Sequence, residues 1–169
     1  MSAVELERFL TVWDAEAQKT TVLLKSLPTD QYDFRPDPDA RSLGELAWHL
    51  AEVEGYMSFG AERGKFEVGM KVPGLERPRT VEELAPGYER VHADSVARVR
   101  RLAEEDLARP REFFGGRQVP LRDILWSAIL LHEVHHRGQL SVLMRLAKGT
   151  VPGLYGPNRE ESKRLAAAR

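Results

Sequence analysis

The stretch LRDILWSAILLHEVHHRGQLSVLMRLAKG, residues 121–149, predicts a single long helix and decides the fold class. Leucine and isoleucine recur along it at helical spacing, and Pro120 and Gly149 stand at its two ends. Proline suits a first helical position because its φ is already fixed, and glycine suits the residue after the last turn. A helix of this length buries an apolar stripe against other helices, which favours a helical bundle.

Three of the chain's five histidines stand in the segment HEVHH of this helix, residues 132–136. At about 100° per residue, His132 and His136 lie within roughly 40° of each other, on a stripe that also holds apolar residues. His135 lies about 60° to one side by the same arithmetic, so we expect it to flank a site rather than to bind a ligand. The pattern predicts two imidazoles, one turn apart, on the stripe that faces the core.

Three more helices are expected, and short sequence signals mark the starts of two of them. Ser42 and Glu45 form the capping-box pattern S-x-x-E, and Thr80 and Glu83 repeat it. Pro86 should kink or shorten the first turns of the helix that follows, because proline removes one backbone hydrogen bond. Together with the helix above, the expected helices cover residues 4–26, 42–63, 80–102 and 120–149.

The connections between these helices are long. Residues 64–79 are rich in glycine and proline and predict a surface segment that could serve as a lid. The glycines at residues 115–116 predict a small hairpin, and Asn158 predicts the cap of a short C-terminal helix. The sequence therefore predicts one all-α domain over residues 1–169, a four-helix bundle with long connections and a short C-terminal extension.

Composition excludes several classes of function. The 25 basic and 26 acidic residues give a net charge of −1, so no overall positive field would recruit nucleic acid or an anionic membrane. The absence of cysteine excludes disulfides, thiolate metal ligands and a cysteine nucleophile. The N-terminus lacks the layout of a signal peptide, and no apolar run is long enough to span a bilayer. We expect a cytoplasmic protein without membrane or nucleic-acid partners.

Metal binding is the chemistry that the histidines favour. A buried neutral imidazole without a partner is costly, so an adjacent pair needs either hydrogen-bond acceptors or a cation. His49 lies mid-stripe on the helix expected at residues 42–63 and offers a third ligand, since three histidines on one helix do not easily converge on one ion. We predict a divalent transition metal at His49, His132 and His136, zinc or nickel first, with iron, cobalt or copper as alternatives. The competing interpretation is a set of hydrogen-bonded core histidines.

The same segment satisfies the metallopeptidase pattern H-E-x-x-H, in which Glu133 would be the general base. No histidine follows residue 136 to supply the third ligand that such peptidases need. Glu133 also precedes Arg137 by four residues, the spacing of an ion pair on an exposed helix face. We favour the ion pair, so Glu133 stays a weak catalytic candidate and a peptidase ranks third among the functions.

Other residues near these histidines have less specific interpretations. Gln139 and Glu52 are weak candidates for catalysis and better candidates for orienting the ligands. His92, at the edge of its helical stripe, is interpreted as an ordinary surface histidine. Trp48 and Tyr56 are expected to pack in the core rather than to stack on a substrate, because aromatic residues at helical spacing usually belong to the core.

Three segments resemble the DinB/YfiT-like family of metalloenzymes: LGELAWHLAEVEGYM at residues 43–57, FFGGRQVPLRDILWSAILLHEVHHRGQLSVLMRL at 113–146, and VPGLYGPN at 151–158. The resemblance extends over about residues 40–160, and H-x-x-x-H followed by RGQL is its most specific part. It implies a four-helix bundle, commonly paired into homodimers, with a divalent metal held by three histidines. Matched position by position, those histidines are His49, His132 and His136.

The resemblance is less informative about the reaction. Such relatives include thiol S-transferases and isomerases that depend on low-molecular-weight thiols, beside damage-inducible members of unknown reaction. We therefore expect a metal-dependent enzyme that transfers a small thiol to an electrophilic small molecule, with metal-dependent hydrolysis next. The alternative from a different class is a noncatalytic, metal-stabilised homodimer that serves a stress response.

Overall fold

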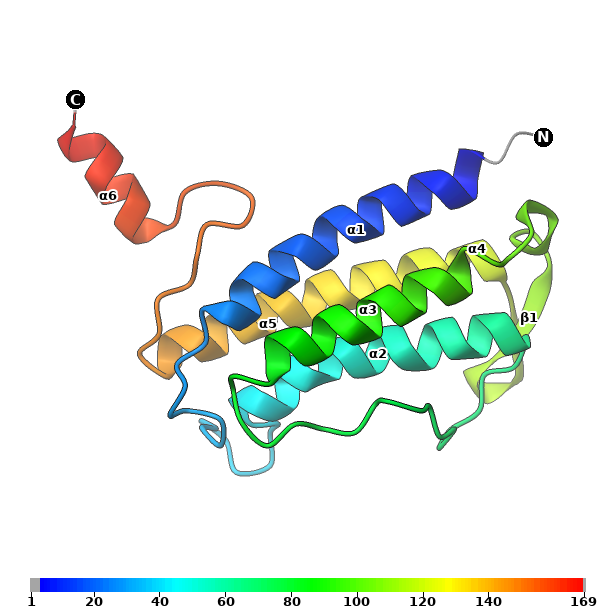
Figure 1. The fold of residues 1–169 in the computed structure, drawn as a ribbon, viewed down its shortest axis with the longest axis horizontal. Coiled ribbons are helices and arrows are strands. Elements are labelled where there is room, and N and C mark those ends of the chain that lie inside the picture. Colours follow the sequence, from blue (N-terminus) through cyan, green and yellow to red (C-terminus); the bar gives the residue numbers. More distant parts are fainter. Residues whose placement is uncertain (1–3, 169) are drawn as a thin grey trace.

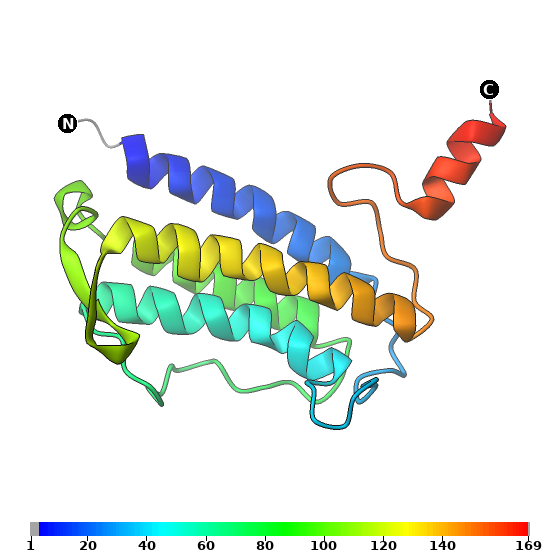
Figure 2. The ribbon, with the colours of Figure 1, turned by 180° about the vertical axis from the view of Figure 1, so that it is seen from behind.

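Four long helical rods lie side by side in the computed structural model, which describes residues 4–168 (Figure 1). The predicted all-α four-helix bundle is confirmed, and the view from behind shows the same packing (Figure 2). Within the described residues, no helix combines the length and the apolar character needed to cross a membrane. The rods are α1 (Val4–Lys25), α2 (Leu43–Arg63), α3 (Leu84–Val99) and a continuous run of α4 (Leu121–Ile124), the π-helical η3 (Leu125–Leu131) and α5 (His132–Leu146).

Helix α2, which carries His49, begins and ends at the signals read from the sequence. The Ser42 hydroxyl accepts from the backbone N–H of Glu45 at 3.2 Å, and the Glu45 carboxylate accepts from the backbone N–H of Ser42 at 2.7 Å. This reciprocal pair satisfies two backbone donors that the helix start leaves free. At the other end, Gly64 adopts the left-handed conformation with φ 69°, which glycine adopts without a steric penalty.

The start of α3 differs from the prediction. Thr80 does not cap the helix, because its hydroxyl contacts the Glu83 carboxylate at 3.1 Å and the helix begins only at Leu84. Pro86 therefore falls in the first turn, where a backbone N–H has no partner within the helix. Proline is tolerated at this place for that reason, and the helix continues beyond it.

A short hairpin lies across one end of the bundle, and a short helix follows the last long rod. The predicted hairpin is present, with β1 and β2 antiparallel and Phe113 opposite Arg117. The predicted C-terminal helix is also present, capped by Asn158 and Glu161, and it stands away from the bundle (Figures 1 and 2). The remaining bounds are η1 (Glu104–Asp106), β1 (Pro110–Phe113), η2 (Phe114–Gly116), β2 (Arg117–Pro120) and α6 (Arg159–Ala167).

Two clusters of buried apolar side chains fill the bundle, one around Trp48 and one around Trp13. Trp48 packs in the core as predicted, and Gly87 of α3 lies so close to it that a Cβ would come within 2.8 Å of the indole ring. Tyr56 does not follow the prediction, because its side chain is 37% exposed. It lines a small cavity with Phe114 beside the hairpin.

The connection between α2 and α3 packs against the bundle over part of its length. Its side chains Phe66 and Val72 are buried. The Tyr32 hydroxyl donates to the backbone carbonyl of Pro78 at 2.5 Å, which ties the end of the connection to the loop before α2. This packing places Arg77 beside α2, where it takes part in the site described next.

Candidate metal centre

His49 of α2 and His132 and His136 of α5 meet at the seam between the two helices. One ring nitrogen from each residue lies within 4.8 Å of the other two. The ring centroid of His49 lies 5.7 Å from that of His132 and 4.6 Å from that of His136. All three side chains are half-buried, so this histidine cluster borders solvent instead of lying in the bundle centre.

The position of the cluster corrects one prediction, because His132 and His136 do not lie on the stripe that faces the core. Leu121 and Leu125 are buried as predicted, but beyond η3 the interior face carries Glu133 and Arg137 instead of the two histidines. The physical reason is the π-helical geometry of η3, which has more residues per turn than an α-helix. An angle of about 100° per residue, applied across this segment, therefore predicts the wrong direction around the helix axis for the side chains that follow it.

Glu52 orients the ring of His49 from one turn along α2. Its Oε2 lies 3.3 Å from Nδ1 of His49, while its Oε1 accepts from Arg77 at 2.9 Å. Burial would raise the pKa of Glu52, but hydrogen bonds from His49 and Arg77 outweigh it and hold the pKa below its ordinary value. An ionised carboxylate accepts a hydrogen bond from Nδ1 of His49, and this contact directs Nε2 toward the other two histidines.

The other two rings are oriented in the same way. Nδ1 of His136 lies 2.6 Å from Oε1 of Gln139, and His132 donates to the backbone carbonyl of Ala128. The Nε2 atoms of His132 and His136 lie 2.6 Å apart. When each Nδ1 carries the proton, two bare lone pairs face each other, and such a contact needs a proton or a metal cation to be favourable.

The electrostatics favour the metal cation. Burial lowers the pKa of His136 to about 4 against the opposing hydrogen bond to Gln139, and burial also lowers the pKa of His132. Both rings are thus neutral near pH 7, which is the form that binds a metal. The residues fit a divalent transition metal: three imidazoles converge, and each has a hydrogen-bonding partner at its other nitrogen.

His135 lies next to the cluster without joining it. Its side chain is exposed, and its ring centroid is 5.0 Å from that of His136. This position agrees with the expectation that His135 flanks the site.

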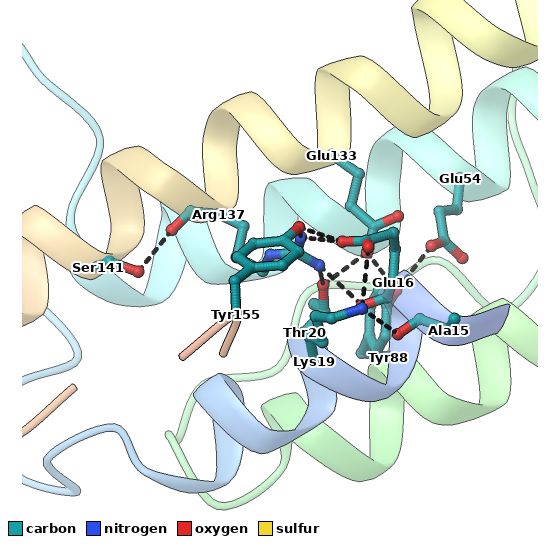
Figure 3. A network of polar contacts seen from close by, with 10 residues as sticks. All are labelled: Ala15, Glu16, Lys19, Thr20, Glu54, Tyr88, Glu133, Arg137, Ser141 and Tyr155. Carbon is teal, nitrogen blue, oxygen red and sulfur yellow. Dashed lines mark hydrogen bonds and ion pairs between the residues drawn. The ribbon is translucent and has the colours of Figure 1, made fainter. Parts of the chain in front are cut away.

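The predicted ion pair between Glu133 and Arg137 on an exposed face is wrong, because the two side chains are 0% and 1% exposed. Oε1 of Glu133 accepts from the hydroxyls of Thr20 at 2.5 Å and Tyr88 at 2.8 Å (Figure 3). Arg137 forms its ion pair with Glu16 of α1. Glu133 therefore faces the bundle interior, and the peptidase pattern loses the geometric support for its general base.

A second buried acid, Glu54 of α2, extends this interior network to α1 and α3. It accepts from Nε1 of Trp13 at 3.0 Å, it lies 2.7 Å from the Tyr88 hydroxyl, and it contacts Nδ1 of His92 at 2.8 Å. Nε2 of His92 lies 2.9 Å from Asp14. Burial alone would lower the pKa of His92, but its two carboxylate partners raise it to about 9. The interpretation of His92 as an ordinary surface histidine is therefore wrong.

Comparison with known proteins decides the family. The profile of the DinB superfamily matches residues 13–140. The chain belongs to the DinB superfamily. The assignment made from the sequence segments is thereby confirmed.

Three relatives show how far the similarity of this DinB chain extends. The uncharacterized protein YrdA of Bacillus subtilis (strain 168) is 30% identical over 158 residues, which cover 92% of this chain and 91% of the relative. A DinB-like protein of Bacillus cereus ATCC 10987, known from its crystal structure, is 33% identical with a TM-score of 0.72, covering 88% of this chain and 97% of that chain. The DinB-like protein YjoA of Bacillus subtilis is 23% identical and shares the fold, with a TM-score of 0.70 and coverage of 90% and 99%.

Proposed function

We propose that the chain binds one divalent transition metal through His49, His132 and His136 and is a metal-dependent enzyme. The observation that carries the proposal is the meeting of three imidazoles from two helices, with a hydrogen-bonding partner for each ring. Zinc and nickel are the favoured ions, with iron, cobalt and copper as alternatives, because imidazole suits all of them.

The residues around the cluster hold protons in fixed places. Glu52 holds the Nδ1 proton of His49 and Gln139 holds that of His136, while Arg77 helps to keep Glu52 ionised. These contacts keep the Nε2 lone pairs free. A divalent ion bound by three nitrogens keeps open positions and supplies a Lewis acid that lowers the pKa of a thiol or of water.

The reaction that we favour is transfer of a low-molecular-weight thiol to an electrophilic small molecule, with hydrolysis as the second choice. The thiol is supported by the resemblance of the sequence to thiol-dependent members of the family. A reaction of either kind is supported by the half-buried position of the three rings, which a small molecule can reach from outside the bundle. We place this enzyme in the cytoplasm as a homodimer, as the sequence leads us to expect.

A noncatalytic role is the alternative. An ion held by His49 from α2 and by two histidines from α5 would link two helices and stabilise the bundle, as in a metal-stabilised homodimer with a role in stress. A peptidase is less well supported, because Glu133 lies on the interior side of α5.

Metal analysis of the purified chain tests the binding step. We expect about one ion per chain in the wild type and a large loss in His49→Ala, since two ligands on one helix hold an ion less firmly than three. His135→Ala is the matched control, because it removes a neighbouring imidazole that is outside the cluster and should keep the wild-type content. An unchanged metal content in His49→Ala would remove the proposed third ligand.

A second assay separates the enzyme from the structural protein. Electrophiles are mixed with several cellular thiols, and thiol consumption is compared between wild type, His49→Ala and Glu133→Gln. The enzyme proposal predicts turnover that requires His49 and survives in Glu133→Gln. Turnover without a thiol would favour hydrolysis, and no turnover by a fully metal-loaded protein would favour the noncatalytic role.

A further inference from the structure

A cavity of about 430 Å³ adjoins the histidine cluster, where the loop before α2 faces the second half of α5. This volume is in the range of small-molecule sites. Most of its lining is apolar, and its only polar lining side chains among the described residues are those of Arg41 and Gln139.

The cavity and the histidine cluster share one residue. Gln139 lines the cavity and also contacts Nδ1 of His136 at 2.6 Å. On the facing helix, Leu46 lines the cavity and precedes His49 by three residues, so the two lie on adjacent turns of one face. One end of a molecule in this cavity would therefore lie beside the metal ligands.

The outer wall of the cavity exposes apolar side chains to solvent. Val142 and Leu146 of α5 are 63% and 51% exposed, and they stand one turn apart above the buried Leu143. Two neighbouring aliphatic side chains with this exposure on one wall of a cavity provide a surface for an apolar group.

Arg41 supplies a positive charge that the described residues leave unpaired. Its side chain is exposed and makes no ion pair or hydrogen bond within residues 4–168. Asp37 and Asp39 precede Arg41 in the same loop, but neither forms an ion pair with it among the described residues. Glu45, four residues after Arg41, is engaged by Arg35 at 3.2 Å and Arg77 at 3.7 Å. No carboxylate lines the cavity to neutralise Arg41. Its planar guanidinium is suited to bind a carboxylate through two hydrogen bonds.

We infer that this cavity binds the substrate and that the substrate is a small organic anion. Its carboxylate pairs with Arg41, its apolar chain or ring lies on Val142 and Leu146, and its reactive end reaches the histidine cluster beside Gln139. The inference rests on the metal-dependent function proposed above for the role of the reactive end, but the binding of the anion itself does not require the metal.

A matched pair of probes tests the charge preference. We would titrate the full ¹⁵N-labelled chain with 3-phenylpropanoate and with 3-phenylpropanamide, which has the same ring and chain without the charge. Amide shifts give both the dissociation constants and the binding position. Each titration is run on the protein as purified and again after chelation, because a carboxylate can also bind a metal directly.

The variants are Arg41→Gln, Arg41→Lys and the control Arg100→Gln, which changes an exposed arginine at the C-terminal end of α3, outside the lining of the cavity. We expect the carboxylate to shift the amide signals of Gln139, Val142 and Leu146, and to bind about tenfold more weakly to Arg41→Gln than to the wild type. Arg41→Lys should fall between them, and the neutral amide should bind all variants equally.

Several results would overturn the inference. Equal affinity of the acid and the amide for the wild type would show that the cavity does not prefer an anion. Unchanged binding of the acid to Arg41→Gln would show that Arg41 does not bind the carboxylate. If the signals of Val142 and Leu146 shift with protein concentration instead of with probe, a second copy of the chain covers the cavity. These outcomes are independent of the metal content of His49→Ala, so failure of the anion site and failure of the metal site can be told apart.

Discussion

Glu133 and Tyr88 are hydrogen-bonded at 2.8 Å inside the bundle, although Glu133 is the immediate neighbour of His132 at the outer seam. The Tyr88 hydroxyl also lies 2.7 Å from Glu54, and it has only one proton to donate. Helix α5 thus presents two polar faces, one toward the candidate metal centre and one toward a buried network. The two faces lead to separate sets of predictions.

Replacing Glu133 by Gln should make the stability of the protein less dependent on pH. Burial, followed by the charge of Glu54, raises the pKa of Glu133 from 4.5 to about 8, so the folded state holds a proton that the unfolded chain releases. The free energy of unfolding of the wild type therefore falls as pH rises from about 4.5 to about 8. Glutamine does not ionise, so the variant does not lose stability in this way. Urea unfolding at several pH values measures the effect. The free energy of unfolding of the variant should rise by about 1–3 kcal/mol relative to that of the wild type as pH increases across this range. A difference in the free energy of unfolding that does not change with pH would contradict the raised pKa.

Replacing His92 by Gln should destabilise the protein mainly below neutral pH. The carboxylates of Glu54 and Asp14 overcome the effect of burial and raise the pKa of His92 from 6.5 to about 9. The stabilisation is fully present below pH 6.5 and is lost as pH rises through about 9. We expect a cost of about 2–3 kcal/mol at pH 6 that shrinks toward pH 9. Thermal or urea unfolding measures it, with the exposed His135→Gln as a control of little effect at either pH.

Replacing Arg137 by Ala should destabilise the bundle by about 3–5 kcal/mol, because the loss of this large buried side chain leaves a cavity and Glu16 keeps only its ion pair with Lys19. Arg137→Lys should also destabilise it, by about 2 kcal/mol, since Arg137 donates to the Glu16 carbonyl at 2.7 Å and to the Thr20 hydroxyl at 3.1 Å besides its ion pair. The exposed Arg122→Lys is the matched control. Urea unfolding of the three variants measures these changes. Equal stability of Arg137→Lys and the wild type would show that the two additional hydrogen bonds of the guanidinium do not contribute to stability.

Replacing Gln139 by Leu should weaken metal binding without unfolding the protein. Gln139 is exposed and contacts Nδ1 of His136, so its loss leaves that ring without its orienting partner. Partners of this kind typically contribute about 10–100-fold in metal affinity. Competition for zinc with a coloured chelator measures the affinity, and Gln118→Leu, at an exposed position of β2, serves as the control. If both variants bind zinc as the wild type does, Gln139 has no part in orienting the site.

Much of the fold follows from local signals in the sequence. The reciprocal cap of Ser42 and Glu45, the left-handed Gly64 and the hairpin near residues 115–116 depend on neighbours along the chain, and each is found as predicted. Thr80 is the exception, because the same capping pattern is present but the helix starts four residues later, at Leu84. A capping pattern indicates only that a side chain can accept a hydrogen bond from the start of a helix. Packing against the rest of the bundle decides where the helix begins.

The three clustered histidines could be named from the sequence, but the face on which they lie could not. An i, i+4 pair on α5 and a single histidine on α2 are visible in the spacing. The π-helical turn of η3 rotates the side chains of α5 around the helix axis relative to those of α4, and no residue pattern within η3 predicts this rotation. The buried network was missed for a related reason. Glu54 and Glu133 are acids on amphipathic helices, and tertiary contacts with residues such as Tyr88 and Thr20 make their burial possible.

The central claim is that imidazoles from two helices bind one ion, and X-ray absorption at the zinc edge of the stoichiometrically loaded protein tests it most directly. We predict three nitrogen ligands at about 2.0–2.1 Å with the outer-shell scattering of three imidazole rings, and the loss of one ring in His49→Ala. The exposed His135→Ala should leave the spectrum unchanged. A spectrum with two rings or fewer in the wild type, or one that His49→Ala does not alter, would contradict the account.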